Sequence, residues 1–132
     1  AFNSADEKRK EKILSHTESR GVDLAIVATG SLKAFEDAID VVRKGGTVMM
    51  FGVPSKGATI DLDMSIVYSK EITIVTSYAA SDHDTKEALE LIHSKKVDAA
   101  KLITHKYSLD ESQKAFDHAR DGTNAMKIII TK

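Results

Sequence analysis

The sequence predicts an α/β fold in three layers, with helices covering both faces of a parallel β-sheet. Apolar runs of strand length alternate along the 132 residues with segments whose apolar residues recur every three or four positions. The run Val22–Ala28 is apolar on both faces of a strand, a pattern typical of parallel strands that are covered on both sides. The chain is also long enough to bury a hydrophobic core.

The first half of the chain predicts two helices and three strands. Ser4 and Glu7 have the spacing of a capping box, which indicates a charged helix that reaches about Ser19. Ser31 is placed to cap a second helix, and the pair Gly45-Gly46 is expected to end it. The predicted strands are Val22–Ala28, Thr47–Val53 and, after a loop, Ile72–Tyr78.

The second half predicts two further helices and two short strands. One helix runs from about Thr85 to Ser94, with Ser81 or Asp82 as its cap. The other follows a second capping box, formed by Ser108 and Glu111, and ends at Asp121-Gly122. The predicted strands on either side of that helix are Leu102–Tyr107 and Met126–Thr131.

Composition excludes several classes of function. The net charge is −1, with 19 basic and 20 acidic residues, so the chain lacks the basic surface that nucleic acid or anionic lipid requires. No apolar run approaches the roughly 20 residues of a membrane span, and no signal peptide is apparent. The absence of cysteine excludes disulfides and fits a cytoplasmic protein.

The ends of the first two strands are candidate ligand-binding positions. In an open parallel sheet, ligands bind beyond the carboxyl ends of the strands, where backbone N–H groups are free. Gly30 and Gly52 stand at two such ends, and each lacks the Cβ that would obstruct a ligand. Glycine also ends strands for turn geometry alone, so this pattern leaves both interpretations open.

Longer stretches resemble a known family. The segments GVDLAIVATGS, AFEDAIDVVRKGGTVMMFGVP, KEITIVTSY and LITHKYSLDESQKAFDHARDG, in this order, are similar to the zinc-dependent medium-chain alcohol, polyol and threonine dehydrogenases. The resemblance implies an incomplete, partial Rossmann fold. Residues 1–101 would form the second half of a dinucleotide-binding domain, with Ala1-Phe-Asn3 as the remnant of its third strand. Residues 102–132 would return toward a catalytic domain that this chain lacks.

The resemblance also implies which residues contact the cofactor, NAD or NADP. Backbone at two strand ends would surround the nicotinamide and its ribose, a third strand end would meet the carboxamide, and one lysine would contact the pyrophosphate. The implied residues are Ala28, Thr29 and Gly30, then Phe51, Gly52 and Val53, then Ser77 and Tyr78, and finally Lys127.

Other family features are absent from the sequence. It contains no Gly-x-Gly-x-x-Gly motif and none of the cysteines of the family's zinc sites. The resemblance therefore implies that zinc is bound only in the missing domain and that this chain alone is inactive. In the intact enzyme, hydride would move between an alcohol or polyol and the nicotinamide. The strand Ile72–Tyr78 would pair with its copy in a homo-oligomer.

Three alternatives compete with these expectations. The cluster Asp82-His83-Asp84 contains potential metal ligands, but residues that precede a helix more often cap it. The whole chain could instead be a self-contained small α/β binding or regulatory module without catalysis. A methyltransferase would need a glycine-rich first loop, which this sequence does not supply. A reading frame upstream of Ala1 that encodes the missing motifs would favour the dehydrogenase.

Overall fold

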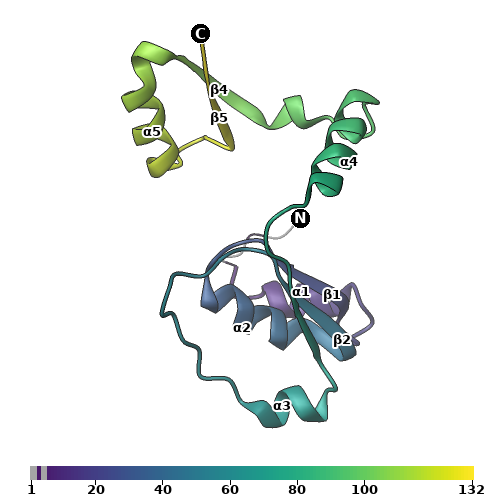
Figure 1. Cartoon of the computed structure of the whole chain (residues 1–132). Helices are drawn as coiled ribbons and strands as arrows, with labels where there is room; N and C mark the ends of the chain where they lie inside the picture. The colour runs from purple at the N-terminus through teal and green to yellow at the C-terminus, as the bar shows by residue number, and fades with distance from the viewer. Residues whose placement is uncertain (1–2, 4–5) are drawn as a thin grey trace. The chain divides into compact units, whose positions relative to one another are not determined.

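Parallel strands form the centre of both parts of this protein (Figure 1). The computed structural model describes residue 3 and residues 6–132. The chain folds as two compact units, a first unit, Ala1–Ala79, and a second unit, Ala80–Lys132. The functional division at residues 101 and 102 stays a prediction about the intact enzyme.

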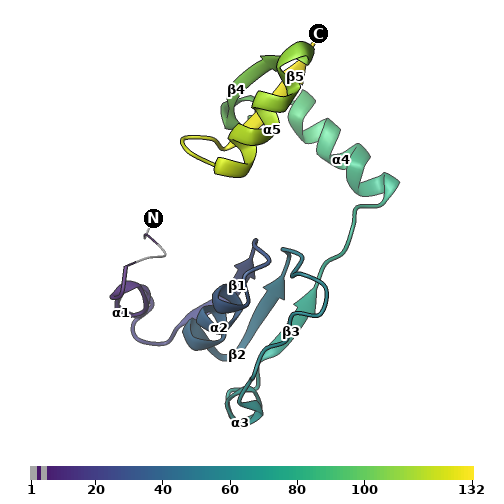
Figure 2. The same ribbon diagram turned by 90° about the vertical axis from the view of Figure 1, so that its left-hand side faces the viewer.

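The first unit is built on a three-stranded sheet. The strands β1 (Val22–Val27), β2 (Val42–Met50) and β3 (Thr73–Thr76) lie in the order β1-β2-β3 and are all parallel, as Figure 2 shows. Helix α2 (Leu32–Val41) connects β1 to β2, and α3 (Met64–Ser69) precedes β3. The predicted α/β fold with parallel strands is confirmed.

The hydrophobic core lies between α2 and one face of this sheet. Val48, at the centre of β2, has no exposed surface, and Phe35 and Ile39 of α2 are 4% and 3% exposed. On the opposite face of β1, Leu24 and Ile26 are 51% and 57% exposed, so within this chain that face is open. The buried core comprises Val27, Phe35, Ala38, Ile39, Val42, Val48 and Ile72.

The boundary between α2 and β2 differs from the prediction. The expected helix stop at Gly45-Gly46 is wrong, because α2 ends at Val41 and both glycines lie inside β2. Val42 is extended, 2% exposed and already paired with Val22. The next β2 residue paired with β1 is Thr47, so β2 contains extra residues here, and Gly45 accommodates them with a φ of +65°.

Two other elements of the first unit also differ. The short helix α3 lies where a loop was predicted. Helix α1 (Arg9–Ser15) ends before Ser19, because Glu18 and Ser19 adopt left-handed backbone angles that no helix continues through. The predicted capping box of this helix includes Ser4, which lies outside the described residues.

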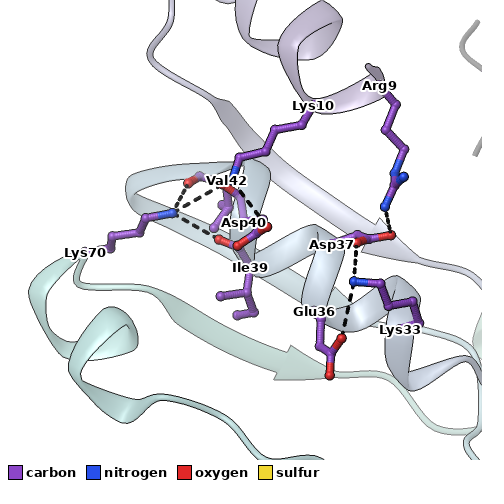
Figure 3. A network of polar contacts seen from close by, with 9 residues as sticks. All are labelled: Arg9, Lys10, Lys33, Glu36, Asp37, Ile39, Asp40, Val42 and Lys70. Carbon is purple, nitrogen blue, oxygen red and sulfur yellow. Dashed lines mark hydrogen bonds and ion pairs between the residues drawn. The ribbon is translucent and has the colours of Figure 1, made fainter. Parts of the chain in front are cut away.

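Ion pairs, rather than buried side chains, hold α1 against α2 (Figure 3). All seven residues of α1 are described, and none of them is buried. Arg9 pairs with Asp37, and Lys10 Nζ lies 3.3 Å from Asp40 Oδ2. Lys33, one turn before Asp37 on α2, lies 3.0 Å from the other Asp37 oxygen. Asp37 therefore accepts contacts from both helices.

Lys70 caps the carboxyl end of α2 (Figure 3). Its Nζ donates to the backbone carbonyl of Ile39 at 3.1 Å and to those of Asp40 and Val42 at 3.4 Å. The last carbonyls of a helix have no partner within the helix, and an ammonium group also interacts favourably with the negative end of the helix dipole. Lys70 thus stabilises the unusually early end of α2.

The second unit contains a two-stranded parallel sheet. Helix α5 (Ser112–Asp121) connects β4 (Ile103–Ser108) to β5 (Lys127–Thr131), with its residue Ala115 buried. Both strands match their predictions to within one residue. The remaining elements are α4 (Asp82–His93) and the 3₁₀ turns η1 (Ala99–Leu102) and η2 (Leu109–Glu111).

The predicted helix caps in the second unit have different outcomes. Ser81 and Asp84 form a complete capping box at α4, and Gly122 ends α5 with a φ of +72°, as predicted. The second capping box is wrong, because η2 separates Ser108 from α5 and the Ser108 hydroxyl donates to Glu111 Oε2 instead. Within the described part of the chain, no helix is long and apolar enough to cross a bilayer.

The ion pairs of α1 predict a dependence on pH. Burial opposes ionisation of Asp37, but hydrogen bonds from Lys33 and Arg9 outweigh it, so the pKa of Asp37 lies below its ordinary value. A lowered pKa stabilises the folded state above the unfolded pKa, and this contribution is lost as the pH falls through the folded pKa. We expect the docking of α1 to be complete at about pH 5 and to weaken below about pH 4.

Amide hydrogen exchange of α1, measured between pH 7 and pH 3, checks this prediction. Each measured rate is divided by the intrinsic exchange rate at the same pH, which gives the protection of the helix. Asp37→Asn should leave α1 poorly protected at every pH, whereas Asp61→Asn, at an exposed carboxylate, should not change its protection. Equal protection of α1 in Asp37→Asn and the unsubstituted protein would contradict the ion-pair account.

Candidate functional site

The carboxyl ends of β1 and β2 lie side by side. The backbone N–H groups of Phe51 and Gly52 both donate to the carbonyl oxygen of Val27, at 3.0 Å and 2.8 Å. Val27 is also the last β1 residue in register with β2, opposite Met50. Because the two strands are parallel, residues 28–30 and residues 51–53 leave the sheet at the same edge, as the sequence predicted.

Each of the two glycines at this edge lies too close to the backbone of the neighbouring segment to carry a side chain. A Cβ on Gly52 would overlap the backbone of Thr29, and a Cβ on Gly30 would overlap the carbonyl group of Val53. The sequence predicts that these glycines make room for a ligand or serve turn geometry. The structure gives a third reason, which is the close approach of the two backbones, and neither residue adopts a left-handed conformation.

The residues around these glycines present apolar surface to solvent. Phe51 is 58% exposed and Val53 is 72% exposed, so both side chains face solvent at the strand ends. Thr29 Oγ1 accepts from the backbone N–H of Ser31, and Ser31 in turn caps α2. Residues 28–30 and 51–53 include no titratable side chain. This edge can therefore bind and orient a planar apolar group, but it cannot transfer a proton.

The end of β3 adjoins the same edge. The backbone N–H of Ser77 donates to the carbonyl oxygen of Met50 at 3.2 Å, which continues the pairing of β2 with β3. Ser77 is half-buried, whereas the side chain of Tyr78 is 87% exposed. The structure thus brings Ser77 to the edge formed by residues 28–30 and 51–53.

The remaining candidate residues lie in the second unit. Lys127 is exposed, opens β5 and is paired with Ile103 of β4. In the cluster Asp82-His83-Asp84, the Asp84 carboxylate accepts from the hydroxyl and the backbone N–H of Ser81. These hydrogen bonds, from the hydroxyl first, lower the pKa of Asp84. Of this cluster, Asp84 takes part in capping α4, whereas Asp82 and His83 lie in the first turn of that helix and do not precede it as predicted.

A polar cluster next to Lys127 is not predicted by the sequence. The hydroxyl of Thr104 contacts His105 and the backbone on both sides of the peptide bond that joins Met126 to Lys127. These contacts depend on how β4 pairs with β5, and no local motif signals that pairing.

Comparisons with known proteins agree on one family. A family model described as zinc-binding dehydrogenase matches residues 1–94. The sorbitol dehydrogenase of Halalkalibacterium halodurans is 30% identical over 131 residues, which are 99% of this chain and 38% of that enzyme. The L-threonine 3-dehydrogenase of Shewanella halifaxensis is 29% identical over 130 residues, or 98% of this chain and 37% of that enzyme.

A solved structure extends the agreement to the fold. The zinc-dependent alcohol dehydrogenase 2 from Streptococcus pneumonia matches with a TM-score of 0.87 and 30% identity. The match covers 98% of this chain and 37% of the solved chain. This chain therefore spans little more than a third of the length of the proteins that it matches.

The contact between the two strand ends predicts a steric cost at Gly52. Gly52→Ala should destabilise the first unit, because the new methyl group overlaps the backbone of Thr29, which cannot move without breaking the sheet edge. Gly57→Ala is the matched control, since no atom lies within 4 Å of its added Cβ and only its φ of +81° opposes the change.

Urea unfolding monitored at Val48 amide resonances measures the difference. The control should cost about 1–2 kcal/mol from its backbone conformation alone, and Gly52→Ala should cost clearly more. Equal costs at the two positions would show that the strand ends are not in rigid contact.

Proposed function

The chain belongs to the zinc-binding dehydrogenase family, and from this premise we propose that it forms the nicotinamide end of the cofactor site in an NAD(P)-dependent alcohol or polyol dehydrogenase. The observation that supports the proposal is the paired edge of β1 and β2, where two parallel strands end in backbone contact. The residues proposed to line the nicotinamide site are Ala28, Thr29, Gly30, Phe51, Gly52, Val53, Ser77 and Tyr78.

The chemistry of these residues fits a nicotinamide. When bound, this ring accepts or donates the hydride. The nicotinamide ring is planar and carries a positive charge only in the oxidised cofactor. Such a ring packs against apolar surface, which Phe51 and Val53 expose, and the backbone of residues 28–30 and of the β3 end would hydrogen-bond its carboxamide. The residues of this edge would bind and orient the ring and leave proton transfer to residues elsewhere. Lys127 would contact the cofactor pyrophosphate as a cation.

Zinc does not fit the residues of this chain. The chain has no cysteine. In the part of the chain that the structure describes, His, Asp and Glu side chains form no group of three that could hold a metal ion. We therefore propose that zinc and the alcohol-binding pocket belong to the portion of the relatives' length that this chain does not span, and that this chain alone transfers no hydride.

Binding of nicotinamide mononucleotide to the 132-residue chain tests the proposal. Because the ligand lacks the adenosine half of the cofactor, it reports on the nicotinamide end alone. We expect its addition at millimolar concentration to shift the amide NMR signals of Thr29, Gly30 and Gly52. Val53→Asp should weaken binding about tenfold, because it removes apolar contact with the ring and adds a carboxylate to the site of a ligand whose net charge is negative.

Tyr68→Asp is the matched control, because Tyr68 is also exposed but lies in α3, which leads into the opposite end of β3. It should leave the affinity unchanged. If the unsubstituted chain shows no shifts at the strand ends, or if both aspartate variants weaken binding equally, the nicotinamide assignment is wrong. The first outcome would favour the binding or regulatory module without a dinucleotide site.

We also propose that the protein is cytoplasmic and forms a homo-oligomer through the strand Ile72–Tyr78. The support for the oligomer is that β3 is an edge strand and that all four of its residues are exposed. An exposed edge offers unpaired backbone groups to a second copy of the same strand.

Light scattering at micromolar concentration checks the oligomer. We expect a dimer or larger assembly, and Val75→Lys should dissociate it, because a lysine on an edge strand opposes strand addition. Val97→Lys introduces the same charge in the second unit and should leave the assembly intact. A monomeric unsubstituted chain, or dissociation by both variants, would refute pairing through β3.

A further inference from the structure

Thr104 is the extra residue of an irregularity in the β4–β5 pair. Ile103 pairs with Lys127, and the next paired position joins His105 to Ile128, so Thr104 has no partner in β5. A bulge of this kind bends the strand and redirects the side chain of the extra residue, and such bulges are frequent next to functional sites. Here the redirected side chain carries a hydroxyl group. This hydroxyl contacts the backbone of Met126, just before β5, and of Lys127, the first residue of β5.

The Thr104 hydroxyl uses all of its hydrogen-bonding capacity. It accepts from the backbone N–H of Met126 at 3.1 Å and lies 3.3 Å from the carbonyl oxygen of Lys127. A carbonyl oxygen only accepts, so the single hydroxyl proton goes to Lys127. His105 Nδ1, 3.0 Å away, must then be the donor of the third hydrogen bond. One side chain thus fixes both ends of the segment Met126-Lys127.

The turn before β5 is fixed from the helix side as well. His118 Nε2 donates to the carbonyl oxygen of Thr123 at 2.9 Å, and the Tyr107 hydroxyl donates to His118 Nδ1 at 2.8 Å. The rings of His105 and His118 contact each other edge to face, with centroids 4.3 Å apart. The backbone that leads into Lys127 is therefore held by residues from both β4 and α5.

We propose that Thr104 is a positioning residue, which fixes the backbone of Lys127 and so restricts where the ammonium group of that lysine can meet an anion. The inference rests on the proposed function, in which Lys127 contacts the pyrophosphate. A lysine side chain loses much rotational freedom when it binds an anion, and a fixed backbone reduces the number of arrangements that must be given up. The bulge places the hydroxyl where it can provide that constraint.

Titration of the 132-residue chain with inorganic pyrophosphate, followed by NMR at the Lys127 amide, tests the inference. Thr104→Val keeps the side-chain shape but removes the hydroxyl, and Thr104→Ser keeps the hydroxyl. We expect Thr104→Val to weaken binding about fivefold, the value of one or two lost hydrogen bonds, and Thr104→Ser to retain the original affinity. Hydrogen exchange of β5 would verify that both variants keep the β4–β5 pair.

A double-mutant cycle with Lys127→Ala separates positioning from a general structural effect. If Thr104 acts through Lys127, Thr104→Val should have no further effect on affinity once Lys127 is alanine. Loss of affinity that persists in the Lys127→Ala background, or equal affinity of Thr104→Val and the unsubstituted chain, would overturn the inference while the role of Lys127 stands. An unsubstituted chain whose Lys127 amide does not respond to pyrophosphate would overturn the role of Lys127 itself, and the inference with it.

Discussion

The first unit depends on one carbonyl group, that of Val27, which accepts hydrogen bonds from two consecutive residues of the neighbouring strand. This arrangement holds the ends of β1 and β2 together beyond the last regular pair of the sheet. The side chain of Val27 is itself buried against the core that α2 and Val48 form. The packing of α2 therefore helps to fix where the strand ends lie. The geometry of any cofactor site on this edge would depend on that core.

Backbone contact at this edge explains why the residues proposed to line the nicotinamide site include two glycines and no charged side chain. Glycine at positions 30 and 52 is required before any ligand binds, because larger residues would separate the strands. The surrounding residues then contribute apolar surface, which suits the proposed recognition of a planar ring. Chemistry that needs a proton donor or a metal must come from other parts of a dehydrogenase. A chain that spans little more than a third of its relatives' length is consistent with that division of roles.

Local residue patterns predict the ends of a helix correctly where those ends depend only on residues within or next to that helix. Ser31, Ser81 and Gly122 act as the helix boundaries that their residue types predict, and the alternation of apolar runs identifies every strand. Local patterns do not predict features that depend on pairing between distant segments. Gly45-Gly46 predicts a helix stop, yet the helix ends earlier. Burial of Val42 and its pairing with Val22 stabilise the fold more than one further helical turn would, since valine is a weak helix former. The role of Thr104 likewise appears only when β5 is in register with β4.

The two proposed ends of the cofactor site rely on different physics. The nicotinamide end depends on shape and backbone contact, which are insensitive to salt and are fixed by the core of the first unit. The phosphate end depends on one exposed cation, and a charge in solvent is screened over about 8 Å at physiological ionic strength. An exposed lysine is therefore effective only when it is held within direct contact distance of its anion. In the proposal, the hydroxyl of Thr104 and the imidazole of His118 would supply that restraint, because both hold the backbone around Lys127 by hydrogen bonds to its carbonyl groups.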